Sequence, residues 1–441
     1  MFNYYLGLAL RSLKRNVVLT VLMIAAVGVG IGASMTTLTV FRAMDADPIP
    51  QKSRQLFAVQ IDNWGPQKNL GLGFGDSENL QPQLGYIDAM ALMNAHQGGR
   101  RSAMYVTGLA LIPKNVDLKP SQVVGRAAYS DFFGMFDTPF LFGGGWSQAD
   151  DRNHADVVVI SRELNDQVFA GANSVGQTLN LDNREYRVTG VLNNWDPTPK
   201  YYDLNNNAYG KSAAVYLPLT RAIDAQMSSW GNYNCAGDTG PPGWEGHLRS
   251  ECVWLQFWVE LPTPQDVDHY RAFLNNYAAD QRAAGRFTWA PHTKLRDVRE
   301  WLVYQKAVTE EARILVLVSF SFLLVCLLNA MGLMLAKIMG RAADIGVRRA
   351  LGANRTAIFS QCLIEAGVIG VAGGILGLAL TALGLLGLRA LLSESVARLT
   401  HMSWSDIAIS VALSVLATML AGLYPTWRAA QVQPAWQLKT Q

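Results

Sequence analysis

The chain has 441 residues, of which half are hydrophobic and only 16% are charged. Soluble proteins carry about 25% charged residues. The net charge of +3 is too small to argue for a nucleic-acid partner. The basic residues gather beside long apolar runs, which is a membrane pattern. The composition therefore predicts a membrane protein, and the length allows two or three domains.

The first 43 residues predict a surface helix followed by a membrane span. Residues 1–16 place leucines on one helical face and carry three basic residues in their last third, Arg11, Lys14 and Arg15, as in a helix lying on the inner membrane surface. Residues 17–43 contain an uncharged run from Val17 to Phe41 that can cross about 30 Å of hydrocarbon. A cleaved signal peptide is the alternative, but its apolar core is usually about 7–15 residues long. We therefore expect a retained first span, in which Gly28 and Gly32 permit close helix contact.

Residues 44–295 contain no stretch apolar enough to span, so they predict a soluble domain. Basic residues before the first span keep the N-terminus inside and place this domain outside, in the periplasm of a two-membrane bacterium. The segment 156–160 is typical of a buried strand, and Ser161 can cap a following helix. A hairpin around Asn183 and a helix capped by Thr263 complete a mixed α/β pattern.

The segment Gly171–Thr178 nearly spells a phosphate-binding P-loop. Gln177 stands where the phosphate-binding lysine is required, and a strand-like segment follows in place of a helix. We interpret the segment as a turn leading into a strand. The sequence also lacks HExxH, GxSxG and paired CxxC motifs, so we expect no catalytic, metal-binding or cofactor-binding residues.

Residues 193–251 are rich in Asn, Gly, Pro and Trp and predict a variable insertion in the outer domain. Cys235 and Cys252 bracket its end, and a disulfide between them is permitted outside the cytosol. Such a bond would stabilise the domain by about 3 kcal/mol. Two free thiols are the alternative. Cys326 and Cys362 lie in or beside apolar runs and are expected to behave as small hydrophobic residues.

Residues 296–336 predict a charged helical stalk that runs into the second span. Asn329 is the notable polar group of that span, and a buried amide in lipid is expected to face another helix. A loop at 337–357 follows, on the cytoplasmic side.

Residues 358–388 predict the third span. Glu365 lies at its cytoplasmic end, where a carboxylate that snorkels to the surface is favoured over a proton relay. Two overlapping GxxxG spacings predict close approach of neighbouring helices, at Gly370, Gly373, Gly374 and Gly377.

A short outer loop at 389–406 separates the third span from a fourth at 407–424. Pro425 and the basic residues of the tail, 425–441, end this span on the inside. The four spans together predict a chain with both termini in the cytoplasm.

The segment between the second and third spans is strongly basic, with Asp344 as its one acidic residue. It is typical of a short helix in which Asp344 and Arg348 pair, and Gly352 is a plausible stop. Two interpretations stay open at this point. The segment is either a basic turn that fixes the orientation in the membrane or a rigid knob that docks into a soluble partner.

The residues from Asp344 to Gly377, DIGVRRALGANRTAIFSQCLIEAGVIGVAGGILG, resemble the signature of FtsX-like ABC transporter permeases of the MacB and LolC/LolE group. The C-terminal AGLYPTWRAAQVQPAWQLKT resembles the closing pattern of that family, and residues 157–192 resemble its periplasmic core domain. Asp344 stands where glutamate is usual, which preserves the charge. In such permeases this loop carries a coupling helix that contacts the ATPase, a role that the resemblance assigns to Asp344, Ile345, Gly346, Val347, Arg348, Arg349, Ala350, Leu351, Gly352 and Ala353.

The resemblance implies a four-span helical membrane domain with an inserted periplasmic α/β domain, located in the bacterial inner membrane. It implies two permeases, identical or paralogous, and separate ATPase chains that hold ATP and magnesium. ATP-driven motion would pass through the coupling helix to the periplasmic domain, which would export a periplasmic substrate with an adaptor and an outer-membrane channel. A regulatory permease that switches a periplasmic hydrolase or a sensor kinase is the alternative, and a membrane-anchored enzyme is a weaker one.

Overall fold

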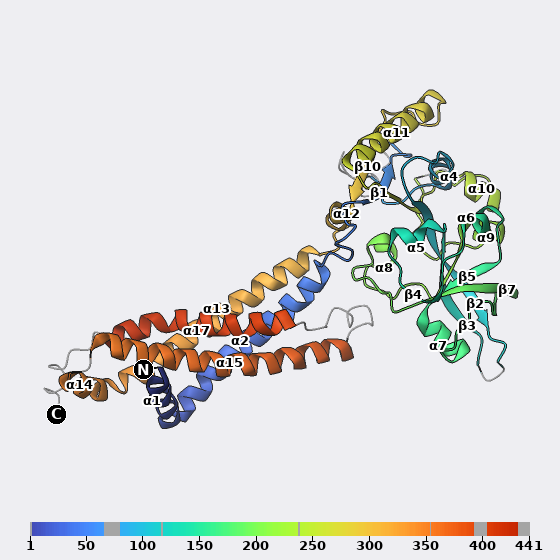
Figure 1. Cartoon of the computed structure of the whole chain (residues 1–441). Helices are drawn as coiled ribbons and strands as arrows, with labels where there is room; N and C mark the ends of the chain where they lie inside the picture. Colours follow the sequence, from blue (N-terminus) through green and yellow to red (C-terminus); the bar gives the residue numbers. More distant parts are fainter. Residues whose placement is uncertain are drawn as a thin grey trace. The chain divides into compact units, whose positions relative to one another are not determined.

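The computed structural model describes residues 2–65, 80–115, 118–236, 239–352, 354–391 and 404–430. The chain divides into two compact units, which we treat separately (Figure 1). The helical unit comprises Met1–Asp45 and Val308–Gln441, and the α/β unit comprises Ala46–Ala307.

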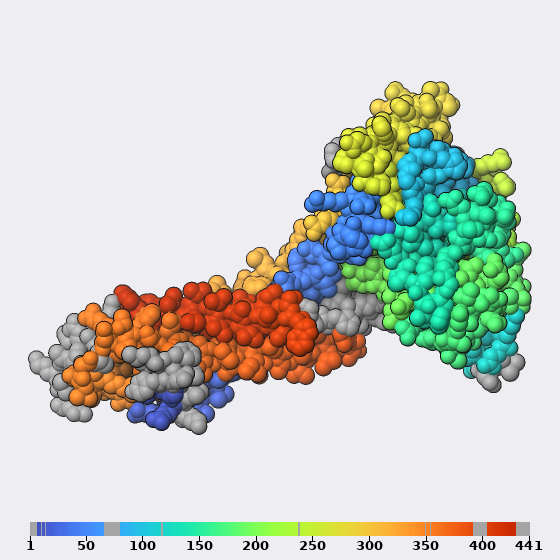
Figure 2. Space-filling view, in the orientation of Figure 1, coloured from blue at the N-terminus to red at the C-terminus, as the bar shows by residue number. Residues whose placement is uncertain are grey.

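Four helices of the helical unit are long and apolar enough to cross a membrane: α2 (Val17–Met44), α13 (Glu310–Met339), α15 (Arg355–Leu391) and α17 (Trp404–Ala430). The two shorter helices are α1 (Phe2–Arg15) and α14 (Ala342–Ala350). Helices α13 and α15 both pack against α2 and α17, and Figure 2 shows α15 and α17 side by side along the helical unit. The expected four-span membrane domain is confirmed.

The fourth helix is longer than expected. It continues through Pro425 to Ala430, whereas we expected the span to end at residue 424. Proline removes one backbone hydrogen bond and strains the preceding turn, but packing of the rest of the helix can carry it past that point. Of the expected outer loop at 389–406, residues 392–403 lie outside the described residues, as does the tail from 431 onward.

The expected continuous stalk is wrong in its first part. Residues Thr293–Asp297 form strand β10, and α12 (Val298–Tyr304) ends before α13 starts at Glu310. The side chains of Asp297 and Thr309 each accept a hydrogen bond from a backbone N–H three residues later and so begin a new helix. Charged residues in this segment therefore belong to a strand and two capped helices.

Ten strands of the α/β unit join in one sheet with the order β10-β1-β9-β2-β3-β8-β5-β7-β4, and β6 pairs with both β2 and β7. The pairs β3–β8 and β5–β7 are parallel, and the other pairs are antiparallel. The strands are β1 (Leu56–Ile61), β2 (Arg101–Ile112), β3 (Ser121–Ala128), β4 (Phe140–Gly143), β5 (Val157–Ile160), β6 (Thr178–Leu181), β7 (Arg184–Leu192), β8 (Val215–Pro218), β9 (Gln256–Glu260) and β10.

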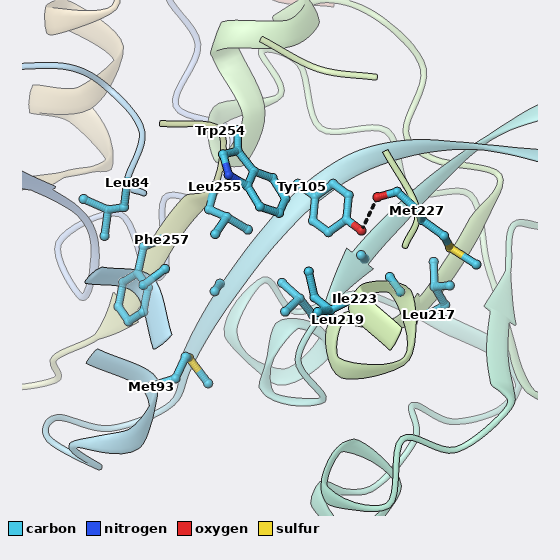
Figure 3. Packing of buried hydrophobic residues seen from close by; sticks show 14 of the residues in the cluster. Leu84, Met93, Tyr105, Leu217, Leu219, Ile223, Met227, Trp254, Leu255 and Phe257 are labelled. Atoms are coloured by element: carbon cyan, nitrogen blue, oxygen red, sulfur yellow. Dashed lines mark hydrogen bonds between the residues drawn. The ribbon is translucent and has the colours of Figure 1, made fainter. Parts of the chain in front are cut away.

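Two hydrophobic clusters cover the two faces of this sheet. Successive residues of β5 fall alternately into one cluster and the other, which explains why this strand is apolar throughout. The three apolar residues of β9, Phe257, Trp258 and Val259, alternate in the same way. In one cluster, Tyr105 packs edge-on against Trp254 and donates a hydrogen bond to the backbone oxygen of Met227 (2.9 Å; Figure 3). The expected mixed α/β domain is confirmed.

The helices of the α/β unit are mostly short. They are α4 (Tyr86–Asn94), α5 (Asp131–Met135), α6 (Gln148–Arg152), α7 (Arg162–Phe169), η1 (Tyr201–Asp203), α8 (Leu204–Asn207), α9 (Leu219–Asp224), α10 (Trp244–Arg249), α11 (Pro264–Ala283) and α12.

Several local predictions are confirmed. The Ser161 hydroxyl accepts a hydrogen bond from the Leu164 N–H (3.2 Å) at the start of α7. Thr263 and Asp266 form a reciprocal capping box at the start of α11. Strands β6 and β7 form the hairpin around Asn183, and the P-loop-like segment is a turn that leads into β6.

The segment 193–251 is more than an insertion, contrary to expectation. It supplies β8, whose four residues are buried between β3 and β5. It also supplies Asp203, which forms a buried ion pair with Arg126 of β3. Residues 214–219, which hold this strand, belong to the looser part of the resemblance to the periplasmic core domain, although the surrounding composition is typical of an insertion.

The first and last strands of the α/β unit pair with each other. Strands β1 and β10 are antiparallel, from Phe57 opposite Asp297 to Ile61 opposite Thr293. The chain enters the unit before β1 and leaves it after β10. Both connections therefore leave from the same end of this ladder.

Candidate functional site

Helix α14 is the short helix between the second and third spans, and it holds most of the residues that the family resemblance assigns to contact with the ATPase. It follows α13 after a turn at Gly340 and Arg341 and ends at Ala350. Gly352 then has φ +98°, in the left-handed region that glycine occupies with little strain, and α15 begins at Arg355. The predicted stop at Gly352 thus follows from backbone geometry.

Helix α14 and the turn that follows it expose apolar side chains. Val347 is 57% exposed and Leu351 83% exposed, and Arg348 lies beside them at the surface, while Gly346 is buried and Ile345 is half-buried. Only the backbone of Arg349 is described, and Ala353 lies outside the described residues. Exposed apolar side chains next to a cation suit contact with another protein.

The expected pair between Asp344 and Arg348 is not formed. The carboxylate of Asp344 accepts a hydrogen bond from Arg15 of α1 (2.7 Å), and Arg348 donates to the side chain of Gln361 (3.1 Å). A pair four residues apart on a helix stabilises by only about 0.2–0.5 kcal/mol. The contacts of Asp344 with Arg15 and of Arg348 with Gln361 therefore replace the expected pair at little cost. Figure 1 shows α1 and α14 at the same end of the helical unit.

Beneath α14, Glu365 of α15 is buried, whereas we expected it to snorkel to the surface. Its carboxylate lies 2.5 Å from the ammonium of Lys337 on α13 and accepts a hydrogen bond from Ser12 of α1 (2.7 Å). Arg341 donates to the backbone oxygen of Ser12 (2.6 Å), and Lys337 donates to Thr20 of α2 (3.3 Å). Partnered charges of this kind are tolerated near lipid, where isolated ones are costly. The cluster ties together α1, α2, α13 and α15.

The four glycines of α15 divide between two neighbours. A Cβ atom built on Gly370 would lie 2.1 Å from Thr418, and one on Gly374 would lie 3.2 Å from Ser414, both of α17. Cβ atoms on Gly373 and Gly377 would instead meet Val27 and Ile31 of α2, at 2.7 and 2.6 Å. Each GxxxG spacing thus serves one neighbouring helix.

Two known domain families match this chain, and both belong to the same kind of permease. Residues 20–276 match the MacB-like periplasmic core domain, and residues 316–434 match the FtsX-like permease C-terminal domain. The chain belongs to the FtsX/MacB-type family of ABC transporter permeases.

Curated relatives of this permease include the macrolide export ATP-binding/permease protein MacB of Escherichia coli K12, which is 25% identical over 439 residues. The same protein of Shigella flexneri is also 25% identical. Both alignments cover 98% of this chain but 60% of the relative, so the permease spans about 60% of the length of these proteins.

Solved structures similar to this permease include periplasmic and extracellular regions of transporters. The periplasmic region of MacB from Actinobacillus actinomycetemcomitans aligns over 58% of this chain and 94% of that one, with 14% identity and a TM-score of 0.36. The extracellular domain of the transporter YknZ from Gram-positive bacteria covers 55% of this chain and 100% of that one, with 9% identity and a TM-score of 0.34.

The α/β unit of the permease contains the expected cysteine pair. Cys235 and Cys252 form a disulfide (2.01 Å), next to a short bridge between Asn234 and Val253. The bond fixes the end of the 193–251 segment to the chain just before β9. Within the ranges that the structure describes, no three His, Cys, Asp or Glu side chains gather so as to hold a metal ion.

The sequence prediction for Asn329 is wrong within this chain. Its side chain lies on the exposed face of α13 and not against another helix of the same permease. The Lys337–Glu365 cluster was missed, although a signal existed. Lys337 and Glu365 each lie at one end of a long uncharged run, on either side of one loop, and charges in such positions usually pair.

Proposed function

We propose that the chain is the permease subunit of a MacB/FtsX-type ABC transporter and that α14 contacts a separate ATPase chain. ATP and magnesium would bind to that partner. Its closure would move α14, and the motion would pass along the spans to the α/β unit, which would act on a substrate outside the membrane. The observation that carries this proposal is the exposed apolar face of α14 between two spans.

The energetics favour a protein partner for this face. Burying a side chain such as Leu351 stabilises a complex by about 1.5–3 kcal/mol, and two such side chains, Val347 and Leu351, stand exposed here. The neighbouring Arg348 favours an acidic rim on the partner.

The distribution of charge supports an orientation with both termini in the cytoplasm of the inner membrane. Basic side chains of α1, α13, α14 and the turn before α14 gather at one end of the spans, namely Arg11, Arg15, Lys337, Arg341 and Arg348. Lysine and arginine favour the cytoplasmic side.

A second permease copy, identical or paralogous, would complete the assembly. The amide of Asn329 lies exposed in the middle of a span, and such a group gains a hydrogen-bond partner when helices associate. By analogy with the name of the curated relatives, the assembly would export its substrate, with a periplasmic adaptor and an outer-membrane channel.

The test is affinity purification of the full chain from its host in mild detergent, followed by identification of every co-purifying chain. Wild-type protein should retain a P-loop ATPase. The variants Val347→Asp and Leu351→Asp, and the double change of Arg348 and Arg349 to Glu, should lose it while inserting normally. Val303→Asp is the matched control, because Val303 is 72% exposed in the α/β unit.

Retention of the ATPase by all α14 variants would remove the coupling role. An ATPase accompanied by a periplasmic hydrolase or a kinase would favour the regulatory alternative over export. If wild-type protein brings down no ATPase under conditions that preserve other membrane complexes, the transporter proposal fails.

A further inference from the structure

A second feature at the α14 end is a pocket of about 300 Å³ lined by α1, α13, α14 and α15. Five cations and two carboxylates line it, so the formal charge of its lining is five minus two, or +3. The charged lining residues are Arg11, Arg15, Lys337, Arg341, Arg348, Asp344 and Glu365.

The two carboxylates do not neutralise this pocket. Asp344 is engaged by Arg15 at 2.7 Å, and Glu365 by Lys337 at 2.5 Å. Arg348 donates to the neutral side chain of Gln361. The pocket therefore keeps an excess of positive charge after its internal pairs are formed.

Arg341 adds an unsatisfied donor to that excess. Its terminal nitrogens bond to Ser12, and one lies 3.8 Å from Glu365. Its Nε, in contrast, is buried and has no hydrogen-bond partner within the described part of the chain. A buried donor without an acceptor costs about 1–3 kcal/mol. Because this nitrogen is buried, an anion in the pocket would neutralise the charge of the guanidinium without bonding to Nε.

Apart from Ser12, Gln361 and Cys362, the remaining lining is apolar and comes from α1, α13, α14 and α15. Leu8, Met334, Ile338, Ile358 and Ile369 form this side of the pocket. A ligand with one anionic group and an apolar remainder matches both sides. Phospholipids with a net negative headgroup have this chemistry, and basic pockets between spans at the membrane surface recognise them.

We propose that this pocket binds the phosphate group of an anionic phospholipid. The headgroup phosphate lies against Arg341 and Arg11, and the acyl chains follow the apolar side of the pocket toward the membrane. Because α1, α14 and α15 all line the pocket, the bound lipid holds the coupling helix against the N-terminal helix. This binding site does not require that the chain be a transporter.

The experiment is native mass spectrometry of the full chain in detergent, titrated with phosphatidylglycerol and, separately, with phosphatidylcholine. We expect one saturable phosphatidylglycerol site and no matching phosphatidylcholine site. Arg11→Gln and Arg341→Gln should each weaken phosphatidylglycerol binding on the order of fivefold, as expected for one juxtamembrane cation. Arg313→Gln, at the other end of α13 and 54% exposed, is the matched control and should bind as wild type does.

The two variants separate binding from folding. Arg341 belongs to the buried cluster, so its variant requires a thermal midpoint measured beside the binding curve. Arg11 is exposed and outside that cluster, so Arg11→Gln should keep the wild-type midpoint. Equal weakening by Arg11→Gln and Arg313→Gln would overturn the proposal, because it would indicate diffuse attraction to the membrane surface.

Two further arms distinguish the source of the phosphate and the kind of partner. Millimolar inorganic phosphate that binds on its own, with no saturable lipid site, would overturn the lipid assignment. Equal binding of phosphatidylcholine would overturn the requirement for an anion. Unchanged lipid binding by Arg11→Gln and Arg341→Gln, together with loss of the ATPase, would assign the cations to a protein partner. Loss of lipid binding with the ATPase retained supports the lipid site independently of the proposed function.

Discussion

The two units of this permease differ in how many large apolar side chains they bury. The α/β unit encloses large aromatic residues on both faces of its sheet, including Tyr105, Phe132, Trp254 and Trp258. The buried apolar clusters of the helical unit are small, and many of its large side chains, such as Leu317 and Leu324, face outward. Exclusion of water can hold the first unit together, but it cannot hold helices surrounded by lipid.

Helix contacts in the second unit therefore depend on close approach and on polar groups. The glycines of α15 allow close approach, and the Lys337–Glu365 cluster supplies polar contacts. The α/β unit has a comparable cluster, in which Arg286 forms ion pairs with Asp88 and Glu251, both at 2.7 Å. Burial lowers the pKa of Arg286, but the hydrogen bonds and charges of Glu251 and Asp88 raise that pKa by more, so the net shift is upward.

The largest expected effect is in the helical unit. Lys337→Met leaves the buried Glu365 without its nearest cation, and Lys337 is only 3% exposed. Breaking a buried pair costs about 3–5 kcal/mol, so the thermal midpoint in detergent should fall strongly. The double variant Lys337→Met with Glu365→Met should recover part of the loss. A single variant as stable as wild type would show that Ser12 and Arg341 suffice for Glu365.

The next effect tests the α/β unit. Cys235→Ser removes the Cys235–Cys252 bond, which closes a loop with a sequence separation of 17 residues. The chain-entropy model gives about 3 kcal/mol for a loop of that length. The loss should appear in thermal unfolding without reductant and vanish with reductant, where wild type falls to the same midpoint. An equal difference under both conditions would mean that the serine disturbs packing and that no bond was lost.

A smaller effect tests close approach between helices. Gly377→Val should destabilise the helical unit by about 1–3 kcal/mol through overpacking, because a Cβ atom there would lie 2.6 Å from Ile31. Gly387→Val on the same helix is the matched control, since a Cβ atom there meets nothing within 4 Å. Equal midpoints in detergent for the two variants would contradict the packing account.

The smallest effect belongs to a helix cap of the α/β unit. Thr263→Ala removes the acceptor for the Asp266 N–H and should cost about 1 kcal/mol. Thr263→Ser keeps a hydroxyl at this position and should retain most of the stability. Chemical denaturation followed by tryptophan fluorescence compares the two. A serine variant as unstable as the alanine variant would assign the effect to the lost methyl group.

Features that depend on neighbouring residues were predictable from the sequence. Uncharged length identified the spans, and Ser161 and Thr263 marked helix starts because a cap needs only the next three residues. Features that depend on packing were not. The burial of Glu365 follows from how α13 and α15 meet, and the position of β8 between β3 and β5 follows from how the sheet assembles.

The candidate site shows the same division. A short helix with a stop at Gly352 could be predicted, but the partner of Asp344 could not, because Arg15 comes from the far end of the sequence. The prediction of a continuous helical stalk failed for a related reason. Charged residues such as those at 296–313 are compatible with a helix or with an edge strand. Residues 296 and 297 are in a strand because β10 pairs with β1.

The β1–β10 ladder determines how the α/β unit responds to mechanical load. Because both connections to the spans leave at the Phe57–Asp297 end, a force that separates α2 from α13 would first pull on α12, which Trp301 anchors by donating a hydrogen bond to the backbone oxygen of Tyr201 (3.1 Å). It would then peel the edge strand β10 away, opening one hydrogen bond after another. A force that moves both helices together leaves the ladder unloaded. The unit can thus be carried as a rigid body by concerted motion of the two spans, whereas opposed motion would unzip it from its edge.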